Sequence, residues 1–227
     1  CVLATLLPLT RSRLWWVRAF DFPRQQIAVL GGIAALGLLA LRPWPHGWDI
    51  ALLAALAAAI AWQLFMILPY TRLWRRQGVA SAGDGDAARS IRLVVVNVLM
   101  TNREFAGLAR SLAETGPDIV LALETDSWWV DRLAELLPEH PHRLLHPLDN
   151  TYGMALFSRL DLVEPELRFL LDEEIPSMRA RVRLRSGEEI VLIGVHPEPP
   201  APSEAETSLP RDAELVLLGR EIDREYG

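Results

Sequence analysis

The sequence predicts an α/β domain preceded by a transmembrane helical hairpin, and three observations lead to this fold class. Two long uncharged apolar runs lie within the first 76 residues. After residue 90, short apolar strand-like runs alternate with amphipathic stretches, a pattern typical of sheets covered by helices. The net charge also changes sign. Eight arginines against two acids give residues 1–76 a net charge of +6, whereas fifteen arginines against 27 acids give residues 77–227 a net charge of −12.

The composition excludes several other classes of protein. The chain has 227 residues, of which 51% are hydrophobic, so it is too apolar to be disordered. Its single cysteine, Cys1, excludes a disulfide framework and a cysteine-based zinc site. Because the sequence begins with Cys and stops without a closing motif, we interpret it as a fragment that is cut at both ends.

The transmembrane region is predicted over residues 1–76. Residues 27–41 and 50–68 are uncharged, and with their flanks they give spans at about 26–43 and 49–68, near the length that a bilayer requires. Residues 1–9 resemble the end of an earlier, truncated span. Three glycines of the first span suit close helix packing, and five tryptophans suit the lipid headgroup level; these are Gly31, Gly32 and Gly37, and Trp15, Trp16, Trp44, Trp48 and Trp74. A buried helical hairpin of a soluble core is the alternative.

The arginines predict the orientation of this hairpin. Four arginines precede the first full span and three follow the second, whereas the turn between the spans holds one arginine and one aspartate. The positive-inside rule therefore places both basic ends, and the acidic domain that follows them, in the cytoplasm.

Residues 77–90 are small, polar and glycine-rich, as in a linker, and residues 91–227 form the predicted soluble domain. Its strands are expected at 91–97, 118–123, 142–146, 153–158, 177–185 and 188–195, the last two joined by a tight turn. Helices are expected at 103–115 with Asn102 as the N-cap, at 127–137 with Ser127 as the N-cap, and at 210–225.

Three of these strands end in one polar, chemically useful side chain. The first ends in Asn97, the second in Glu124 and the last in His196. Polar groups at strand ends are a common way to build a site, because the scaffold below them is rigid. A carboxylate suits Mg²⁺, an amide can orient a phosphate or water, and a histidine can move a proton near neutral pH.

Four segments resemble the endonuclease/exonuclease/phosphatase superfamily. They are RLVVVNVLMTNRE, PDIVLALETDSWWVDRL, NTYGMALFSRLDL and IGVHPEPP, and together they extend over the predicted domain. This fold is shared by DNase I, the exonuclease III-type abasic endonucleases, neutral sphingomyelinases and inositol polyphosphate 5-phosphatases. The apolar helices before the domain are similar to those of the bacterial membrane-anchored branch, which implies a multi-pass protein of the bacterial inner membrane.

The resemblance implies a DNase I-like two-sheet sandwich with flanking helices and Mg²⁺-dependent hydrolysis of a phosphoester, with Mn²⁺ as a possible substitute. It implies that Glu124 ligates the metal and that Asn97 and His196 are catalytic, with His196 contacting the scissile phosphate. Asn102, Tyr152 and Arg211 are further candidates for substrate binding. The family continues with Gly-Asp-x-Asn and Asp-His motifs that this sequence lacks, so we expect the C-terminal part of the domain to be missing and the fragment to be inactive alone.

Each candidate also has a purely structural interpretation. Glu124 suits the N-terminus of the following helix, Asn97 and Tyr152 suit turns, and His196 suits a loop beside prolines. Four alternating arginines give one strand a basic face, which we interpret as solvated and paired with acids such as Glu188 and Glu189 rather than as a phosphate ladder; they are Arg179, Arg181, Arg183 and Arg185. His140, His142 and His146 are interpreted as a surface cluster.

The expected function is a membrane-anchored Mg²⁺-dependent phosphoesterase that acts on a nucleic acid, a phospholipid or a headgroup phosphoester, with the lipid bilayer as its other partner. The acidic domain lacks the broad basic stripe that grips duplex nucleic acid. One alternative is a non-catalytic, membrane-tethered binding or scaffold protein on the same fold, and another is a membrane protein of an unrelated α/β fold. No protein partner can be inferred.

Overall fold

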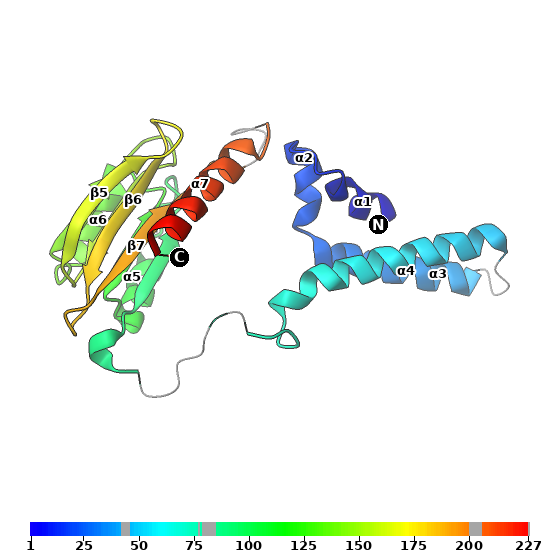
Figure 1. The fold of residues 1–227 in the computed structure, drawn as a ribbon, viewed down its shortest axis with the longest axis horizontal. Helices are drawn as coiled ribbons and strands as arrows, with labels where there is room; N and C mark the ends of the chain where they lie inside the picture. Colours follow the sequence, from blue (N-terminus) through cyan, green and yellow to red (C-terminus); the bar gives the residue numbers. More distant parts are fainter. Residues whose placement is uncertain (42–45, 77, 79–84, 200–205, 227) are drawn as a thin grey trace. The chain divides into compact units, whose positions relative to one another are not determined.

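The computed structural model describes residues 1–41, 46–76, 78, 85–199 and 206–226. The chain forms two compact units (Figure 1). One comprises Cys1–Ala80 with Glu198–Ala213, and the other Ser81–Pro197 with Glu214–Gly227. Residues 42–45, which include Trp44, and residues 77 and 79–84 of the predicted linker lie outside the described residues.

The first unit is helical. Its elements are α1 (Val2–Leu9), α2 (Trp15–Arg18), η1 (Ala19–Asp21), α3 (Arg24–Leu41), α4 (Gly47–Ile67) and η2 (Leu68–Tyr70). Helices α3 and α4 lie side by side along their length (Figure 1). Gly31 permits close approach, because a Cβ there would lie 3.0 Å from Ile60 Cγ1. The prediction was wrong for Gly32 and Gly37, which have open space beside them.

Two helices of this unit are long and apolar enough to cross a membrane, Arg24–Leu41 and Gly47–Tyr70. Length and composition alone are weak support, since a signal sequence or a soluble core helix has the same properties. Only 11% and 17% of their apolar windows are buried, however, whereas a soluble core helix is mostly buried. One buried polar side chain interrupts the apolar packing: Gln63 donates to Thr5 Oγ1 at 2.9 Å and accepts from Arg24 at 3.3 Å.

The second unit contains two β-sheets. The first sheet has the strand order β1-β2-β4-β3 and the second has the order β5-β6-β7. Strands β1 and β2 are parallel, and the other pairs are antiparallel. The elements are η3 (Ala87–Arg89), β1 (Leu93–Asn97), α5 (Ala106–Thr115), β2 (Ile119–Leu123), α6 (Ser127–Leu136), β3 (His142–His146), β4 (Met154–Ser158), β5 (Leu162–Phe169), β6 (Pro176–Arg183) and β7 (Glu189–Val195). Helix α7 (Leu209–Tyr226) extends over the boundary of the two units.

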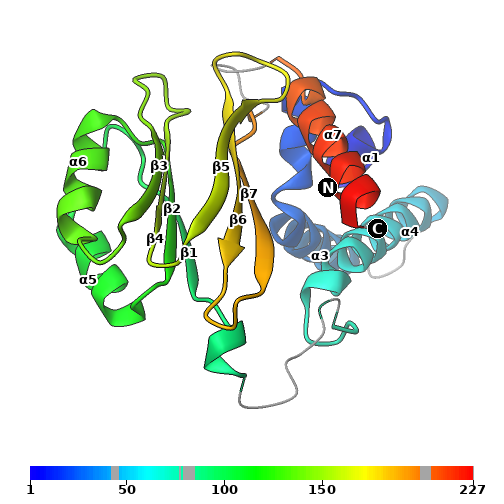
Figure 2. The same cartoon turned by 60° about the vertical axis from the view of Figure 1, so that its left-hand side comes forward.

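The two central strands of the first sheet, β2 and β4, are buried on both faces, as their continuous apolar runs predict, whereas the edge strands β1 and β3 are partly exposed. In β2, Val120 and Ala122 pack toward α5 and α6, whereas Ile119 and Leu121 pack toward the second sheet. Figure 2 shows the resulting order of helices, first sheet and second sheet. Gly194 of β7 lets the sheets approach, because a Cβ there would lie 3.0 Å from Leu121 Cδ2.

Three local predictions were wrong. Strand β5 was not expected because its sequence LVEPELRF contains a proline and two acids; the structure places it at a sheet edge with a register shift between Val163 and Glu166, where a proline is tolerated. Helix α5 begins at Ala106 rather than 103, because Asn102 Oδ1 instead accepts from Glu104 N in a preceding turn. Helix α6 is capped by Asp126, whose carboxylate accepts from Trp129 N, and not by Ser127.

The three arginines of β6, and Arg185 shortly after it, are ion-paired, as interpreted from the sequence. Of the two acids named there, Glu189 is a partner of these arginines, whereas Glu188 pairs with Arg89. Arg181 pairs with Glu164 and Glu189, and Arg183 pairs with Glu189 and Asp161. Arg168 pairs with Glu221 of α7, and Arg179 pairs with Glu221 and Glu225 of the same helix. Arg185 pairs with Asp118. The basic face therefore stabilises the packing of this unit.

Candidate functional site

Three strand ends of the second unit bring Asn97, Glu124 and His196 together. Asn97 lies opposite Leu123 in the parallel β1–β2 pair, so its side chain reaches Glu124, the residue that directly follows β2. Its Nδ2 donates to Glu124 Oε1 at 2.5 Å. His196 follows β7, and its Nε2 lies 3.8 Å from the same carboxylate oxygen. The predicted convergence of these three groups is therefore present, although their roles stay a prediction.

The backbone at Glu124 is strained and tightly held. Its φ is +60°, a left-handed conformation that is uncommon for residues other than glycine and often found at functional sites. Thr125 N donates to Gly153 O at 3.0 Å, and Leu148 N donates to Thr125 O at 3.1 Å. A Cβ on Gly153 would lie 1.9 Å from Thr125 O, so only glycine permits this clamp. The surrounding backbone thus fixes the carboxylate at the strand end.

Asn97 is fixed by a hydrogen bond from its own loop. Its Oδ1 accepts from Leu99 N at 2.9 Å, and Leu99 has a φ of +56°. With the oxygen used in this way, the NH₂ group faces Glu124. The same amide therefore closes the turn and orients the Glu124 carboxylate.

His196 lies against Tyr152. Their ring centroids are 5.8 Å apart with an interplanar angle of 51°. Tyr152 is 8% exposed, and its backbone N donates to Asn150 Oδ1. Tyr152 is therefore a packed turn residue that also supports the imidazole of the site.

The other two candidates are not brought to this cluster by any contact in the described residues. Asn102 is used in the turn before α5, with its side chain accepting from Glu104 N. Arg211 pairs with Asp212 at 2.9 Å in the first unit. Their substrate-binding roles stay predictions.

Sequence reasoning missed a charged cluster at the start of α6, two residues after Glu124. Arg103 makes two hydrogen bonds to Asp126, at 2.6 and 3.2 Å, and its guanidinium carbon lies 4.6 Å from the centroid of a Trp128 ring. The hydrogen bond from Arg103 is the main reason why the pKa of Asp126 is lowered from its usual value. No sequence pattern marks Arg103, because its partners are more than twenty residues away along the chain.

Of the three histidines interpreted as a surface cluster, His140 contradicts the interpretation. His140 is only 1% exposed, and its Nε2 lies 3.1 Å from Pro117 O. Burial is the main reason why the pKa of His140 is lowered. His142 faces Asp161, and His146 packs against Phe169, so the three residues do not form a cluster.

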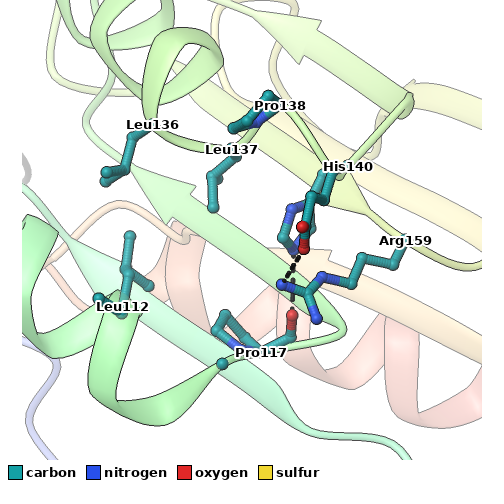
Figure 3. A pocket seen from close by; sticks show the side chains of 10 residues that line it. Leu112, Pro117, Leu136, Leu137, Pro138, His140 and Arg159 are labelled. Carbon is teal, nitrogen blue, oxygen red and sulfur yellow. Dashed lines mark hydrogen bonds and ion pairs between the residues drawn. The ribbon is translucent and has the colours of Figure 1, made fainter.

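His140 lines a mainly apolar hollow of about 270 Å³ at the other end of the sheet. Figure 3 shows Leu112, Leu137 and Pro117 around it, with Arg159 reaching in beside His140. Arg159 is already paired with Glu139 at 2.8 Å. The charges of this hollow thus satisfy one another, and we assign no site here.

The residues at the three strand ends fit a hard divalent cation in part. In the described part of the chain, no group of three or more His, Cys, Asp or Glu side chains is placed to hold a metal. Mg²⁺, however, is commonly held by one or two carboxylates, with water and substrate phosphate completing its coordination. Glu124, half-buried beside a neutral amide, is a carboxylate of this chemical type.

Comparisons with known proteins agree with this geometry. The model of the Endonuclease/Exonuclease/phosphatase family matches residues 94–227. A search among curated proteins found no relative that matches the chain. Similar solved structures include D. rerio TDP2 humanized by 14 mutations, with 19% identity, a TM-score of 0.50 and coverage of 60% of this chain and 57% of that chain.

Two further structures show how far the likeness extends. D. rerio TDP2 complexed with single strand DNA product has 18% identity, a TM-score of 0.50 and coverage of 60% and 56% of the two chains. An endonuclease/exonuclease/phosphatase from Bacteroides vulgatus has 16% identity, a TM-score of 0.48 and coverage of 60% and 61%. The chain thus spans little more than half the length of these proteins, and the likeness is one of fold. With its two-sheet architecture and a family match over more than half of its length, this chain belongs to the Endonuclease/Exonuclease/phosphatase family.

Proposed function

We propose that this protein is a membrane-anchored, Mg²⁺-dependent phosphoesterase. The observation that carries the proposal is the convergence of Glu124, Asn97 and His196 from three separate strand ends of a family domain whose members hydrolyse phosphoesters. A carboxylate, an amide and an imidazole within one small region are the groups that such hydrolysis uses.

In this proposal Glu124 holds the metal, with Mn²⁺ able to replace Mg²⁺. When bound, the cation supplies positive charge that stabilises the negative charge of the phosphoryl oxygens. Asn97 keeps the Glu124 carboxylate in one orientation through the 2.5 Å hydrogen bond. His196, supported by Tyr152, donates a hydrogen bond to a phosphate oxygen or a proton to the leaving oxygen.

The proposed anchor is the α3–α4 hairpin of the first unit. Its apolar windows are mostly exposed in the folded chain, with large side chains such as Val29, Ile33, Leu36 and Phe65 open to the surroundings. Lipid would cover these side chains. The arginines at both basic ends of the hairpin favour a cytoplasmic location for the catalytic domain.

The substrate is a phosphoester, and three classes are in competition. The DNA product bound by a TDP2 structure favours a nucleic acid. The net charge of −12 over residues 77–227 opposes a grip on duplex DNA, and the proposed anchor favours a phospholipid or headgroup phosphoester.

The test uses the protein of the full reading frame, reconstituted in lipid nanodiscs and freed of metal with EDTA. Plasmid DNA, bis-p-nitrophenyl phosphate and phospholipid are supplied as substrates while Mg²⁺ is titrated. Glu124→Gln is expected to lower the Mg²⁺-dependent rate about 100-fold or more, since it removes the metal's charged ligand. Glu135→Gln, on the exposed side of α6, is the matched control and is expected to keep the wild-type rate.

Unchanged turnover in Glu124→Gln would reject the ligand assignment. If the wild-type protein hydrolyses none of the three substrates at any Mg²⁺ concentration, the non-catalytic scaffold becomes the better explanation. Release of the protein from membranes by alkaline carbonate would reject the anchor without affecting the assignment of the site.

A further inference from the structure

A basic and aromatic segment directly follows the second apolar helix. The apolar stretch Gly47–Tyr70 has 24 residues, so as a helix it extends about 36 Å, roughly 6 Å more than a hydrocarbon core of about 30 Å. On the proposed membrane anchor, the residues after Tyr70 therefore lie at the level of the lipid headgroups. This is the layer in which phosphates are concentrated.

The chain turns back at this point and forms a hollow. Thr71 N donates to Leu68 O at 3.0 Å and Trp74 N to Thr71 O at 3.3 Å, while the Thr71 hydroxyl donates to Leu68 O at 2.8 Å. These bonds define a tight turn in the segment from 69 to 76. The open hollow that this segment lines measures about 700 Å³, room enough for a phospholipid headgroup.

Three arginines line this hollow, Arg72, Arg75 and Arg76. All three are exposed, and none has an acidic partner among the residues that the structure describes. Most other arginines differ: Arg18 and Arg24 of the same unit pair with Asp21, and those of β6 pair with acids of the second unit. Three uncompensated guanidinium groups on one turn produce a local positive potential.

The aromatic and apolar side chains of the segment suit the same environment. Tyr70 is 91% exposed and Leu73 85% exposed, which is unfavourable in water for an apolar side chain. Trp74 lines the hollow with the arginines. Tyrosine and tryptophan are the residues that prefer the membrane–water interface, where an apolar ring and a polar tip are both accommodated.

We propose that the segment from 69 to 76, here called the juxtamembrane turn, binds the phosphate of an anionic phospholipid headgroup. One guanidinium group can donate two parallel hydrogen bonds to two phosphate oxygens. The three arginines line one hollow that has room for a headgroup. This inference rests on the proposed membrane anchor but not on the proposed catalysis. The expected ligand is an anionic lipid, because a zwitterionic headgroup would bring its own positive charge close to the arginines.

The test measures which lipids stay with the full-length protein. Nanodiscs are made with equal amounts of phosphatidylglycerol and phosphatidylcholine, and the lipids retained by the protein are counted by native mass spectrometry. We expect several-fold enrichment of phosphatidylglycerol over the bulk composition, and we expect it to decrease with added salt. Replacing all three arginines by glutamine should abolish the enrichment, since it removes every guanidinium group that lines the hollow.

Two control variants keep the result interpretable. The double variant Arg11→Gln/Arg13→Gln removes two other exposed arginines of the first unit and should keep the enrichment. The triple Arg→Lys variant keeps the charge but not the paired geometry and should keep part of it. It also serves as the folded reference if the triple glutamine variant fails to insert.

Equal retention of both lipids by the wild-type protein, or full enrichment in the triple glutamine variant, would overturn the inference. Loss of enrichment in the Arg11/Arg13 variant would overturn it as well, because the attraction would then belong to the whole basic surface. A protein that stays in solution without lipid would instead refute the membrane anchor itself.

Discussion

The two ends of strand β2 each carry a carboxylate, and the two are used in opposite ways. Asp118, before the strand, accepts from Arg92 N at 2.8 Å and from the Arg185 guanidinium. Burial tends to raise the pKa of Asp118, but these hydrogen bonds outweigh burial and lower it. Glu124, after the strand, is buried to a similar degree, yet its partners are a neutral amide and a histidine.

The difference separates a structural carboxylate from one that is available to a ligand. Asp118 has its charge compensated by an arginine, so it contributes mainly to stability. Among the described residues no arginine pairs with Glu124, so its charge is available to a cation. We therefore expect substitutions at the Asp118 end to change stability and substitutions of Glu124 itself to change activity. At the Glu124 end, stability depends instead on the backbone clamp and on the cap of the following helix.

The largest effect on stability is expected for Gly153→Ala. Its Cβ would lie 1.9 Å from Thr125 O and 2.6 Å from Leu148 N, and backbone atoms cannot move aside as a flexible side chain can. We expect a loss of about 3 kcal/mol or more. Hydrogen exchange of the β2 and β4 amides in the intact protein measures it.

The matched control for Gly153→Ala is Gly107→Ala in α5, where nothing lies within 4 Å of the new Cβ. It should stabilise the domain by about 0.5 kcal/mol. Equal effects of the two variants would show that the clamp around Glu124 is not rigid.

The next effect concerns the Asp118 end. Asp118→Asn removes the charge that holds Arg185 and weakens the bond from Arg92 N, and we expect a loss of about 2 kcal/mol. Because the pKa of Asp118 is lowered in the folded state, its contribution is present at neutral pH and is lost as the pH falls through that lowered value. Urea unfolding followed at neutral and acidic pH measures both quantities.

Asp161→Asn is the control for Asp118→Asn. Asp161 pairs with His142 and Arg183 but is 56% exposed, so its removal should cost less than about 0.5 kcal/mol. If both variants lose equally, the assignment of Asp118 as the structural carboxylate is wrong.

The contrast between the two ends also explains what could be predicted from the sequence. Strands β2 and β4 are continuous apolar runs, so their position follows from composition, and the polar residues directly after them identify candidates such as Glu124. Strand β5 could not be found in this way, because Pro165 and its acids are tolerated only at the edge of a sheet, and strand order is a tertiary property.

The geometry of the site is tertiary in the same sense. The sequence orders Asn97, Glu124 and His196 along the chain, but the parallel β1–β2 register is what places the first two in hydrogen-bond contact. The need for glycine at 153 and the burial of His140 depend on segments 20 or more residues away, such as Thr125 and Pro117. No local pattern reports such contacts.

A smaller effect is expected at the helix that follows Glu124. Asp126→Ala removes the cap of Trp129 N and the two bonds from Arg103, and we expect a loss of about 1–2 kcal/mol. Ser127→Ala, at the position that the sequence favoured as the cap, should change stability by less than about 0.5 kcal/mol. Thermal unfolding of both variants shows which residue caps the helix. A larger loss of stability in the Ser127 variant would contradict the observed cap.

The smallest effect is a pH dependence at the other end of the sheet. Burial lowers the pKa of His140 in the folded state, so below the ordinary histidine value of about 6.5 the unfolded chain binds a proton that the folded chain resists. Stability should therefore fall as the pH decreases through this range, lowering the melting temperature by a few degrees. His140→Gln should flatten this dependence, whereas His142→Gln should preserve it because His142 lies at the surface beside Asp161. If the stability of the His140 variant falls equally steeply with decreasing pH, the acid sensitivity belongs to other groups.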